Sequence, residues 1–246
     1  MKICSAHQPA FLPWLGLIHK IMVCDTFVVM DIAKFRKRAF MHRNKIEING
    51  KANYLGLKFD AESDYKTCDL LQLNKNNVHC LDEIYKKTEH TYIKSKFKNE
   101  ILDFLQKTIV NINNYNFNKI CINQLEYICK KLSIHTKIIL ESSFLIKDEI
   151  KDLGASRRLL SHAQHTNSKV YITGINSTDY LDVEIFKKNN IYHLVQKFNY
   201  DIFRNLQKCE DPLSIIHQIA HLGFDNLANL MNETQINKEK ILTDLK

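Results

Sequence analysis

Residues 5–16 read Ser-Ala-His-Gln-Pro-Ala-Phe-Leu-Pro-Trp-Leu-Gly, and this stretch decides the fold that we expect. It joins an apolar run over residues 2–7, typical of a strand, to an amphipathic run over residues 14–24, typical of a helix. A strand that ends in polar residues and enters a helix places those residues at the carboxyl edge of a sheet, where open α/β sheets bind ligands. A turn that only packs would explain the two prolines, but it would not require the polar pair His7 and Gln8.

The rest of the chain continues this alternation. An apolar run over residues 26–31 follows the first helix, and a strand–helix–strand unit predicts parallel pairing. Apolar residues recur at helical spacing from about 70 to 133, which predicts a helical insertion. The remaining expectations are an irregular basic segment at 32–50, strands at 52–59, 136–144, 169–173 and 191–198, helices at 156–164 and 183–188, and terminal helices at about 213–232. We therefore predict a single domain over residues 1–246, with an α/β fold, a parallel-sheet Rossmann-like core, the helical insertion and C-terminal helices.

The composition is that of a globular protein with a surplus of positive charge. Hydrophobic residues make up 45% of the chain and charged residues 25%, which excludes wholesale disorder. Lysine and arginine outnumber aspartate and glutamate by 35 to 27, and this net charge of +8 favours anionic partners such as nucleotides, sugar phosphates or RNA. No apolar run is long enough to span a membrane. Seven cysteines without a Cys-x-x-Cys motif or zinc-ligand spacing predict reduced thiols in a cytoplasmic protein, with no metal site.

A dense cluster of positive charge follows Asp31. Residues 34–45 contain six lysines and arginines and no acidic residue. Arginines such as Arg38 and Arg43 suit two-point recognition of phosphate or carboxylate. Phe35 could stack on a base or a sugar, or it could fix the segment to the core. We interpret the segment as a binding loop for an anion, with a solvated basic loop as the alternative and RNA as a further ligand that would fit.

Short motifs spread along the chain resemble those of the WbqC-like protein family. They are His7-Gln8-Pro9, Leu12-Pro13-Trp14-Leu15-Gly16, Lys20, Asp25, Asp31, Phe35, Lys37-Arg38, Arg43-Asn44, Tyr85-Lys86-Lys87, Arg158-Leu159, Tyr171 to Gly174, Asp179-Tyr180-Leu181, Leu213-Ser214-Ile215-Ile216 and Gly223. The resemblance covers roughly residues 2–230. It implies an enzyme encoded among bacterial surface-polysaccharide genes, those of O-antigen, capsule and related glycans. It implies a pathway more than a reaction.

The layout also resembles, more loosely, that of nucleotidylyltransferases and class I synthetases. Those enzymes place a short polar motif after the first strand and a second phosphate motif late in the chain. Here His7, the turn at residues 13–16 and His19 occupy the first position, and residues 173–178 follow a late strand as the second motif does. The literal motifs are absent, so the likeness is one of layout.

These observations predict one crevice at the carboxyl ends of the strands at 2–7, 26–31 and 169–173. A neutral His7 would take a proton from an attacking amine or give one to a leaving group, and Asp31 would orient it or bind a sugar hydroxyl. Cationic side chains would hold a phosphate or carboxylate and stabilise developing negative charge. The expected catalytic residues are His7, Gln8 and Asp31, and the expected substrate-binding residues are Trp14, Lys20, Phe35, Arg38, Arg43, Asn44, Lys86, Lys87, Arg158, Gly174 and Tyr180.

Three functions fit this sequence. The first is a transferase of bacterial surface-polysaccharide biosynthesis, which moves an acyl or aminoacyl group onto a nucleotide-linked amino sugar. The second is an ATP-consuming nucleotidylyltransferase or ligase, and the third is a non-catalytic subunit that binds a glycan precursor or RNA. The lack of a Gly-x-Gly-x-x-Gly fingerprint argues against hydride transfer. The sequence leaves the sugar, the group donor, any cofactor and the oligomeric state open.

Overall fold

The structure of the chain is a computed structural model, and it describes residues 1–37, 39–177 and 179–245. Within these residues, five strands form a sheet in the order β5-β2-β1-β6-β7, and every neighbouring pair is parallel. The strands are β1 (Ile3–His7), β2 (Thr26–Val29), β5 (Lys137–Leu140), β6 (Val170–Thr173) and β7 (Tyr192–Val195). The predicted α/β fold with a parallel sheet is confirmed.

The sheet has a switch point between β1 and β6, where the chain reverses its direction of growth. From β1 the chain adds β2 and then β5 on one side, and it returns to add β6 and then β7 on the other side. At such a point the connections that leave the two central strands diverge, which opens a crevice at the carboxyl edge. His7 ends β1 and Thr173 ends β6, so both residues lie at this edge.

Helices cover both faces of the sheet. Successive side chains of a strand point to opposite faces, and β6 shows this alternation. Tyr171 packs against α5 (Lys147–His165), whereas Ile172 packs in a separate apolar cluster at the end of α1 (Leu15–Met22). The face of α5 also carries α6 (Glu184–Lys188). Burial on both faces is the reason that the central strands β2 and β6 are continuous apolar runs in the sequence.

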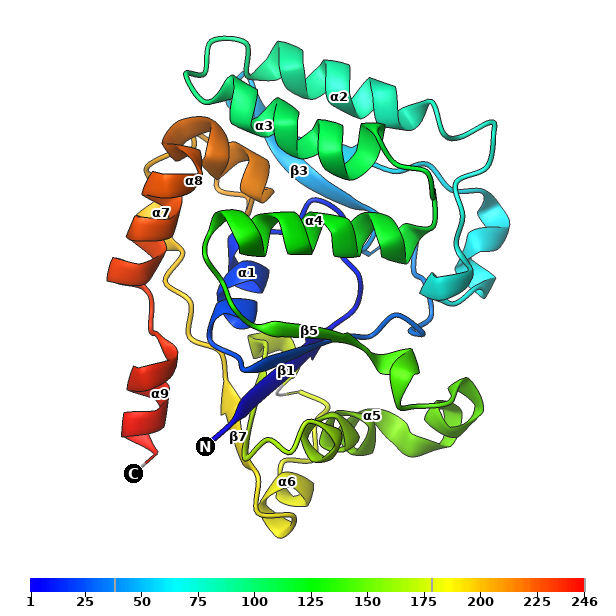
Figure 1. Cartoon of the computed structure of the whole chain (residues 1–246), viewed down its shortest axis with the longest axis vertical. Helices are drawn as coiled ribbons and strands as arrows, with labels where there is room; N and C mark the ends of the chain where they lie inside the picture. The colour runs from blue at the N-terminus through cyan, green and yellow to red at the C-terminus, as the bar shows by residue number, and fades with distance from the viewer. Residues whose placement is uncertain (38, 178, 246) are drawn as a thin grey trace.

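A layer of helices lies at one end of the molecule. Figure 1 shows α2, α3 and α4 on one side of the sheet and α5 and α6 on the other. The layer consists of α2 (Cys80–Thr91), α3 (Lys98–Leu105) and α4 (Phe117–Lys131), with the 3₁₀ helices η1 (Ala61–Tyr65) and η2 (Cys68–Leu70) before it and the π-helical turn η3 (Gln106–Val110) after α3. Its helices lie where the periodicity predicted them, and Ile101, Phe104 and Leu105 are fully buried.

We expected the basic segment at residues 32–50 to be irregular. Its second half, residues 43–50, instead belongs to a β-hairpin. β3 (Arg43–Ile48) pairs antiparallel with β4 (Lys51–Gly56) in a sheet of its own. Asn49 and Gly50 form the turn with φ angles of 51° and 75°, and two such positive angles are what a two-residue hairpin turn demands. Ile46 is buried between partly exposed neighbours, so the alternation of a strand was present beneath the charge.

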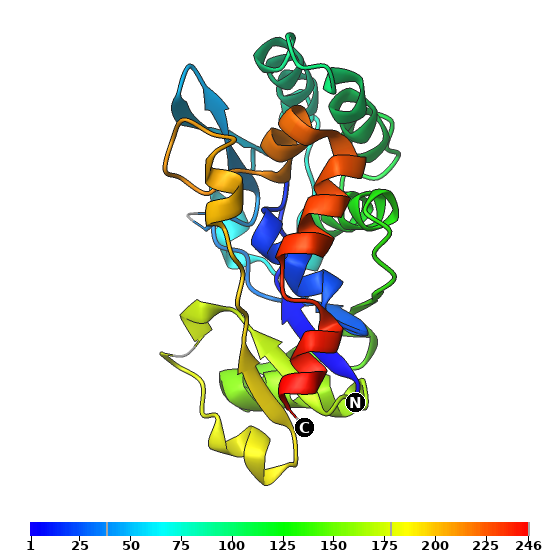
Figure 2. The ribbon, with the colours of Figure 1, turned by 90° about the vertical axis from the view of Figure 1, so that its left-hand side faces the viewer.

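The C-terminal region is more helical than we predicted. Its helices are α7 (Asp201–Arg204), α8 (Ile215–Thr234) and α9 (Lys238–Asp244). α8 accounts for the terminal helices expected at about 213–232, but α9 was not predicted because its sequence is mostly polar. Figure 2 shows α9 beside β7, and Ile241 and Leu242 pack there, together with Leu194 of β7, against the buried cluster that contains Val170 and Ile172.

Candidate functional site

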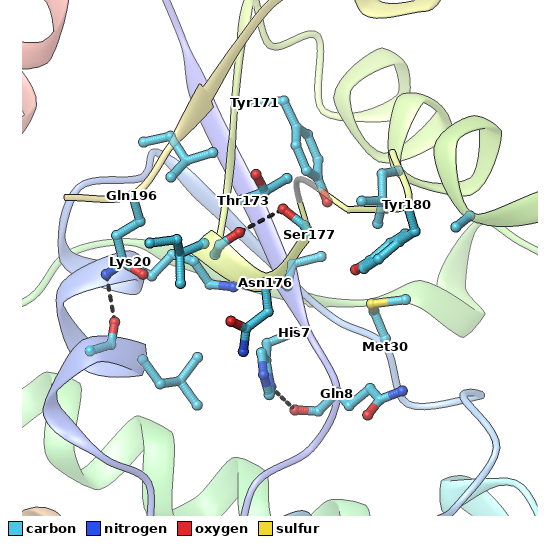
Figure 3. Close-up of a pocket in the computed structure, with 18 of the residues that line it drawn as sticks. His7, Gln8, Lys20, Met30, Tyr171, Thr173, Asn176, Ser177, Tyr180 and Gln196 are labelled. Carbon is cyan, nitrogen blue, oxygen red and sulfur yellow. Dashed lines mark hydrogen bonds between the residues drawn. The ribbon is translucent and has the colours of Figure 1, made fainter. Parts of the chain in front are cut away.

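A cavity of about 490 Å³ opens at the carboxyl edge of the sheet, at the switch point between β1 and β6 (Figure 3). Its walls come from the end of β1, from α1, from the end of β6 with the loop that follows, and from the second half of α5. Its lining includes His7, Gln8, Trp14, Lys20, Arg158, Tyr171, Thr173, Gly174, Asn176, Ser177, Tyr180 and Gln196. The predicted crevice therefore lies at the ends of the first and third of the three strands that we expected to form it, and Met30, from the end of the second, also lines it.

His7 ends β1 and stands in the cavity wall. Its Nδ1 lies 2.7 Å from the backbone oxygen of Gln8, and because a carbonyl oxygen only accepts, we assign the ring hydrogen to Nδ1 and the lone pair to Nε2. Trp14 packs edge-to-face on the ring, with centroids 5.3 Å apart at 75°. Burial, and then the positive charge of Lys20, lower the pKa of His7 to about 3. The imidazole is thus neutral, and Nε2 can accept a proton or a hydrogen bond.

Lys20 supplies positive charge to the same cavity from α1. Its side chain is buried, and Nζ donates to the backbone oxygen of Ala6 at 2.9 Å. No aspartate or glutamate of the described residues forms an ion pair with it. Burial lowers the pKa of Lys20 to about 8, so the ammonium keeps its proton at neutral pH without a balancing carboxylate. A bound anion would supply the missing partner.

Trp14 and Gly16 shape the mouth of the cavity. A Cβ at position 16 would lie 2.9 Å from Nε1 of Trp14, closer than side-chain carbons approach in proteins, so only glycine lets the indole lie over the first turn of α1. Gln196 Nε2 donates to the backbone oxygen of Gly16 at 2.7 Å and to Nδ1 of His19 at 3.0 Å. Nε2 of His19 in turn donates to the backbone oxygen of Ile236 at 2.7 Å. His19 supports the wall from behind and is not part of the cavity lining among the described residues.

The loop after β6 forms the opposite side of the mouth. It begins at Gly174 and continues through the 3₁₀ helix η5 (Ile175–Ser177), where Ser177 Oγ donates to the backbone oxygen of Gly174 at 2.6 Å. Figure 3 shows the Asn176 amide pointing toward His7, and the Tyr180 hydroxyl pointing into the cavity from the other side. Asn176 was not among the expected site residues, although the segment that contains it was recognised as a candidate second motif.

The α5 wall holds a buried network of four polar side chains. Glu141, in the 3₁₀ helix η4 (Glu141–Ser143) that follows β5, is fully buried and accepts from Arg158 Nε at 2.6 Å and from Arg158 Nη2. Nε2 of His162 donates to the same carboxylate at 2.8 Å, and Nδ1 of His162 accepts from the Tyr171 hydroxyl at 3.3 Å. Burial opposes the ionisation of Glu141, but the hydrogen bonds from Arg158 and His162 outweigh it and keep its pKa below the usual value. Burial lowers the pKa of His162, which is therefore neutral.

Sequence reasoning missed Glu141 and His162. The available signals were an acidic residue directly after a strand, at the same edge as His7, and the i, i+4 spacing of Arg158 and His162 on one helix. Arg158 was expected to bind substrate; it lines the cavity and also pairs with Glu141.

The expected site residues divide into two groups by position. Those that line the cavity are His7, Gln8, Trp14, Lys20, Arg158, Gly174 and Tyr180. Those that do not are Asp31, Phe35, Arg43, Asn44, Lys86 and Lys87, whereas Arg38 lies outside the described residues. The expected convergence of the basic segment with His7 is therefore wrong for the described part of that segment.

Asp31 and Phe35 have structural surroundings. The Asp31 carboxylate accepts from the backbone N–H of Ser142 at 2.9 Å and from its hydroxyl at 2.6 Å, so it holds the turn after β5 and does not orient His7. Phe35 has no exposed surface and packs edge-to-face on Phe59 and Phe117, so it cannot stack on a ligand.

The remaining basic and amide residues belong to the hairpin and to α2. The Asn44 amide donates to the backbone oxygen of Leu12 at 2.6 Å, which ties β3 to the loop after β1. The Arg43 guanidinium lies 4.4 Å from the centre of the Tyr54 ring. Lys87 Nζ donates to the backbone oxygen of Tyr54 at 3.3 Å, and its neighbour Lys86 is exposed on α2, as in a solvated helix face.

The chemistry of the lining favours an anionic ligand. Of the described residues that line the cavity, two are cations, Lys20 and Arg158, and none is an aspartate or a glutamate. Nowhere in residues 1–37, 39–177 and 179–245 do three histidine, cysteine, aspartate or glutamate side chains gather as a metal site requires. In the same residues, every helix is too short or too polar to cross a membrane.

Comparisons with known proteins agree with the earlier resemblance. The protein of Mycobacterium tuberculosis described as "Uncharacterized protein Rv1507c" is 21% identical over 227 residues, which cover 91% of this chain and 95% of that protein. No solved structure matches the chain significantly. The model of the WbqC-like protein family matches residues 8–229, and the chain belongs to this family.

Proposed function

We propose that this protein is a transferase of bacterial cell-surface polysaccharide assembly, which binds a nucleotide-linked amino sugar in the cavity and moves an acyl or aminoacyl group onto its amino nitrogen. The family resemblance supports the pathway. The observation that carries the chemistry is the meeting of two groups at one sheet edge: a neutral imidazole, His7, and a buried ammonium, Lys20, for which the described part of the chain supplies no carboxylate partner. The first suits proton transfer from an amine, and the second suits a phosphate of the substrate.

Binding and catalysis are coupled in this proposal. The charge of Lys20 is one cause of the low pKa of His7. A phosphate bound to Lys20 offsets that charge and raises the pKa of His7, so the imidazole becomes a stronger base once the substrate is in place. We therefore expect His7 to be a stronger base when a phosphate is bound to Lys20 than when none is.

The transfer itself needs one proton acceptor and one polarised carbonyl. The amine nitrogen attacks the carbonyl carbon of an activated acyl donor, a thioester or an ester, and the new C–N bond forms. His7 Nε2 takes the proton that the nitrogen loses and returns it to the leaving thiol or alcohol as the old bond breaks. The Asn176 amide, which points toward His7 in Figure 3, is placed to hold a substrate oxygen during this step.

An ATP-dependent nucleotidylyltransferase or ligase is the second candidate function. In chain order the sheet reads third, second, first, fourth and fifth strand, the order of a Rossmann-like core, and the cavity lies at its switch point. This arrangement supports the nucleotidylyltransferase-like layout. ATP itself would then occupy the cavity, with its phosphates at Lys20.

A thermal-shift panel separates these functions, because a ligand that binds only the folded state raises the apparent melting temperature. The panel contains nucleoside diphosphate amino sugars, ATP and short RNA. We expect stabilisation by the nucleotide sugars; stabilisation by ATP alone would favour the second function, and stabilisation by RNA alone would favour a non-catalytic subunit.

Substitution of His7 tests the catalytic step. We expect His7→Ala to keep nucleotide-sugar binding while product formation, followed by mass spectrometry with acyl and aminoacyl donors, falls by about 100-fold or more. His90→Ala is the matched control, because His90 is an exposed histidine on α2. A fully active His7→Ala variant would show that His7 is not the base.

A further inference from the structure

We propose that Glu141 and His162 position Arg158 as a second anion-binding group, so that the cavity binds the two linked phosphates of a diphosphate between Lys20 and Arg158. This inference rests on the proposed function, because it names the part of the nucleotide-linked substrate that the cavity recognises. It assigns Arg158 to substrate binding and makes Glu141 and His162 positioning residues.

The hydrogen-bond geometry of Arg158 leaves one edge of its guanidinium for a ligand. A guanidinium carries five N–H groups in a planar fork. Glu141 accepts from Nε and Nη2 on one side of the fork, so the Nη1 hydrogens and one Nη2 hydrogen remain. Arg158 lines the cavity, and 16% of its side chain is exposed. The remaining edge suits a second oxyanion bound through two parallel hydrogen bonds.

The carboxylate of Glu141 fixes the direction of that edge. Glu141 has no exposed surface, and it is held in turn by His162 Nε2 and, through His162, by the hydroxyl of Tyr171. A guanidinium gripped along one side by a buried carboxylate cannot swing as a surface arginine does. Less side-chain entropy is then lost when a ligand binds to the other side.

Lys20 and Arg158 approach the cavity from opposite faces of the sheet. Lys20 belongs to α1, whereas Arg158 belongs to α5. A single phosphate can neutralise Lys20 alone, but two linked phosphates can place one charge on each wall. None of the described lining residues is an aspartate or a glutamate; the carboxylate that contacts Arg158, that of Glu141, is fully buried behind the lining. Two cations on different walls of one cavity therefore suit two linked phosphates better than one.

The same network could serve packing alone, and the two roles predict different measurements. If the network only packs, its disruption should lower the free energy of unfolding and reduce the affinity for every ligand by a similar factor. A positioning role predicts that the preference for pyrophosphate over orthophosphate falls, while the affinity for orthophosphate, held by Lys20, is kept. The ratio of the two dissociation constants is therefore the decisive readout.

The first experiment measures these two constants by calorimetry with inorganic pyrophosphate and orthophosphate as probes. We expect the wild-type protein to prefer pyrophosphate by about tenfold to a hundredfold, the worth of one more hydrogen-bonded charged group. Arg158→Lys replaces the fork with a point charge that Glu141 retains, and we expect it to lose most of this preference. Arg157→Lys is the matched control, because Arg157 is exposed on the same helix.

The second experiment tests the positioning role. Glu141→Gln removes the charge that fixes the guanidinium, and we expect the same loss of preference with orthophosphate binding kept. Should this variant fail to fold, His162→Gln, which leaves the Arg158–Glu141 pair intact, is expected to lower the preference by a smaller factor. An unchanged ratio in Arg158→Lys overturns the proposal, and so does a wild-type protein without preference.

These outcomes separate the inference from the function that it extends. A pyrophosphate preference that depends on Arg158, in a protein that processes no nucleotide sugar, would refute the proposed transferase and leave the subsite in place. Turnover of a nucleotide sugar, together with a ratio of pyrophosphate to orthophosphate dissociation constants that does not change in Arg158→Lys, would support the transferase and refute the subsite.

Discussion

Lys20 places an ammonium where water is largely excluded, and the described residues give its Nζ one hydrogen-bond acceptor, the backbone oxygen of Ala6. Such a group destabilises the folded chain, because transfer of a charge out of water is costly when no opposite charge compensates. An anion bound in the cavity removes that cost. In our proposal, the residue that binds substrate therefore lowers the free energy of unfolding of the protein without ligand.

The pH dependence of unfolding measures this expense. Burial lowers the pKa of Lys20 in the folded state to about 8, from 10.5. Between these two pH values the unfolded chain binds the proton and the folded chain does not, so the free energy of unfolding rises with pH across the window. The free energy of unfolding rises by about 3 kcal/mol in total, because each unit of pKa difference corresponds to 1.36 kcal/mol.

We therefore expect wild-type protein to gain up to about 3 kcal/mol relative to Lys20→Met as the pH rises from below 8 to 10.5, measured by denaturant unfolding. Taking the difference cancels the tyrosines and thiols that titrate in both proteins. Lys86→Met, on the exposed face of α2, is the matched control for the removal of one ammonium group. A difference that stays flat with pH would mean that Lys20 is already solvated or paired.

Individual site residues could be predicted where a local connection between two elements also determines where their side chains point. His7 and Lys20 flank the turn between the first strand and the first helix, and that local connection brings both to the cavity. Asp31 also follows a strand, but its side chain turns to Ser142, more than a hundred residues away. Glu141 and Arg158 are only 17 residues apart, but their pairing joins the end of β5 to α5, and the spacing of the residues does not say that these two elements meet.

Two helices are interrupted by glycine, and the interruption in α5 bears on the site. Gly154 has φ 65° and ψ 165°, and Gly223 in α8 has φ 74° and ψ 172°. This region of backbone space is essentially closed to residues with a Cβ. The second half of α5 begins directly after the break, and Ala155 and Arg158 then line the cavity. The glycine sets the direction from which Arg158 enters.

The two glycines also make a matched pair for a test of stability. A Cβ at position 154 would meet no atom within 4 Å, whereas a Cβ at position 223 would lie 2.6 Å from the Phe97 ring. We expect Gly154→Ala to lower the free energy of unfolding by about 1–3 kcal/mol, the cost of backbone strain alone. Gly223→Ala should lower it by more, because the ring must also move. Equal losses in denaturant unfolding would contradict the steric part of this explanation.

Element boundaries were predictable where local chemistry was read correctly. The strand–helix–strand start and the periodic helices after residue 70 follow from spacing alone. The strand expected at 52–59 corresponds to β4, but β3 and its pairing with β4 were not predicted, because the charges of residues 34–45 mask the alternation. Asn49-Gly50 is nevertheless a strong turn signal. α9 was not predicted because it has few apolar residues, and the sequence does not show that these residues pack against the sheet.

At the scale of the molecule, the order of the strands was beyond a single sequence. Local alternation predicts that strands pair in parallel, but it does not say that β6 lies beside β1. That pairing creates the switch point, and the switch point creates the cavity. The position of the site is thus a property of the whole sheet, while the residues that fill it are properties of its individual connections.

The cysteines are distributed so that their reactivity can show whether each apolar cluster of the fold is closed to solvent. All seven lie in described residues, and six are buried, with Cys209 partly exposed. The buried thiols are spread over three apolar clusters: Cys4, then Cys24, then Cys68, Cys80, Cys121 and Cys129. Burial raises their pKa values, to about 11 for Cys4 and about 12 for Cys68 and Cys129. Thiols without solvent access and without thiolate character do not react.

A thiol-reactive disulfide reagent therefore tests all three clusters at once. We expect one thiol per native chain to react in a first, rapid phase, that of Cys209, because it is partly exposed although burial also raises its pKa, and all seven to react after unfolding in guanidinium. Cys209→Ser should abolish the rapid phase without changing the slow one, whose rate then reports how often the clusters open. Two or more rapid thiols in the native protein would mean that at least one of these clusters is accessible to solvent. The identity of the extra cysteine, found by mass spectrometry of the labelled chain, would show which layer of the fold is less tightly packed.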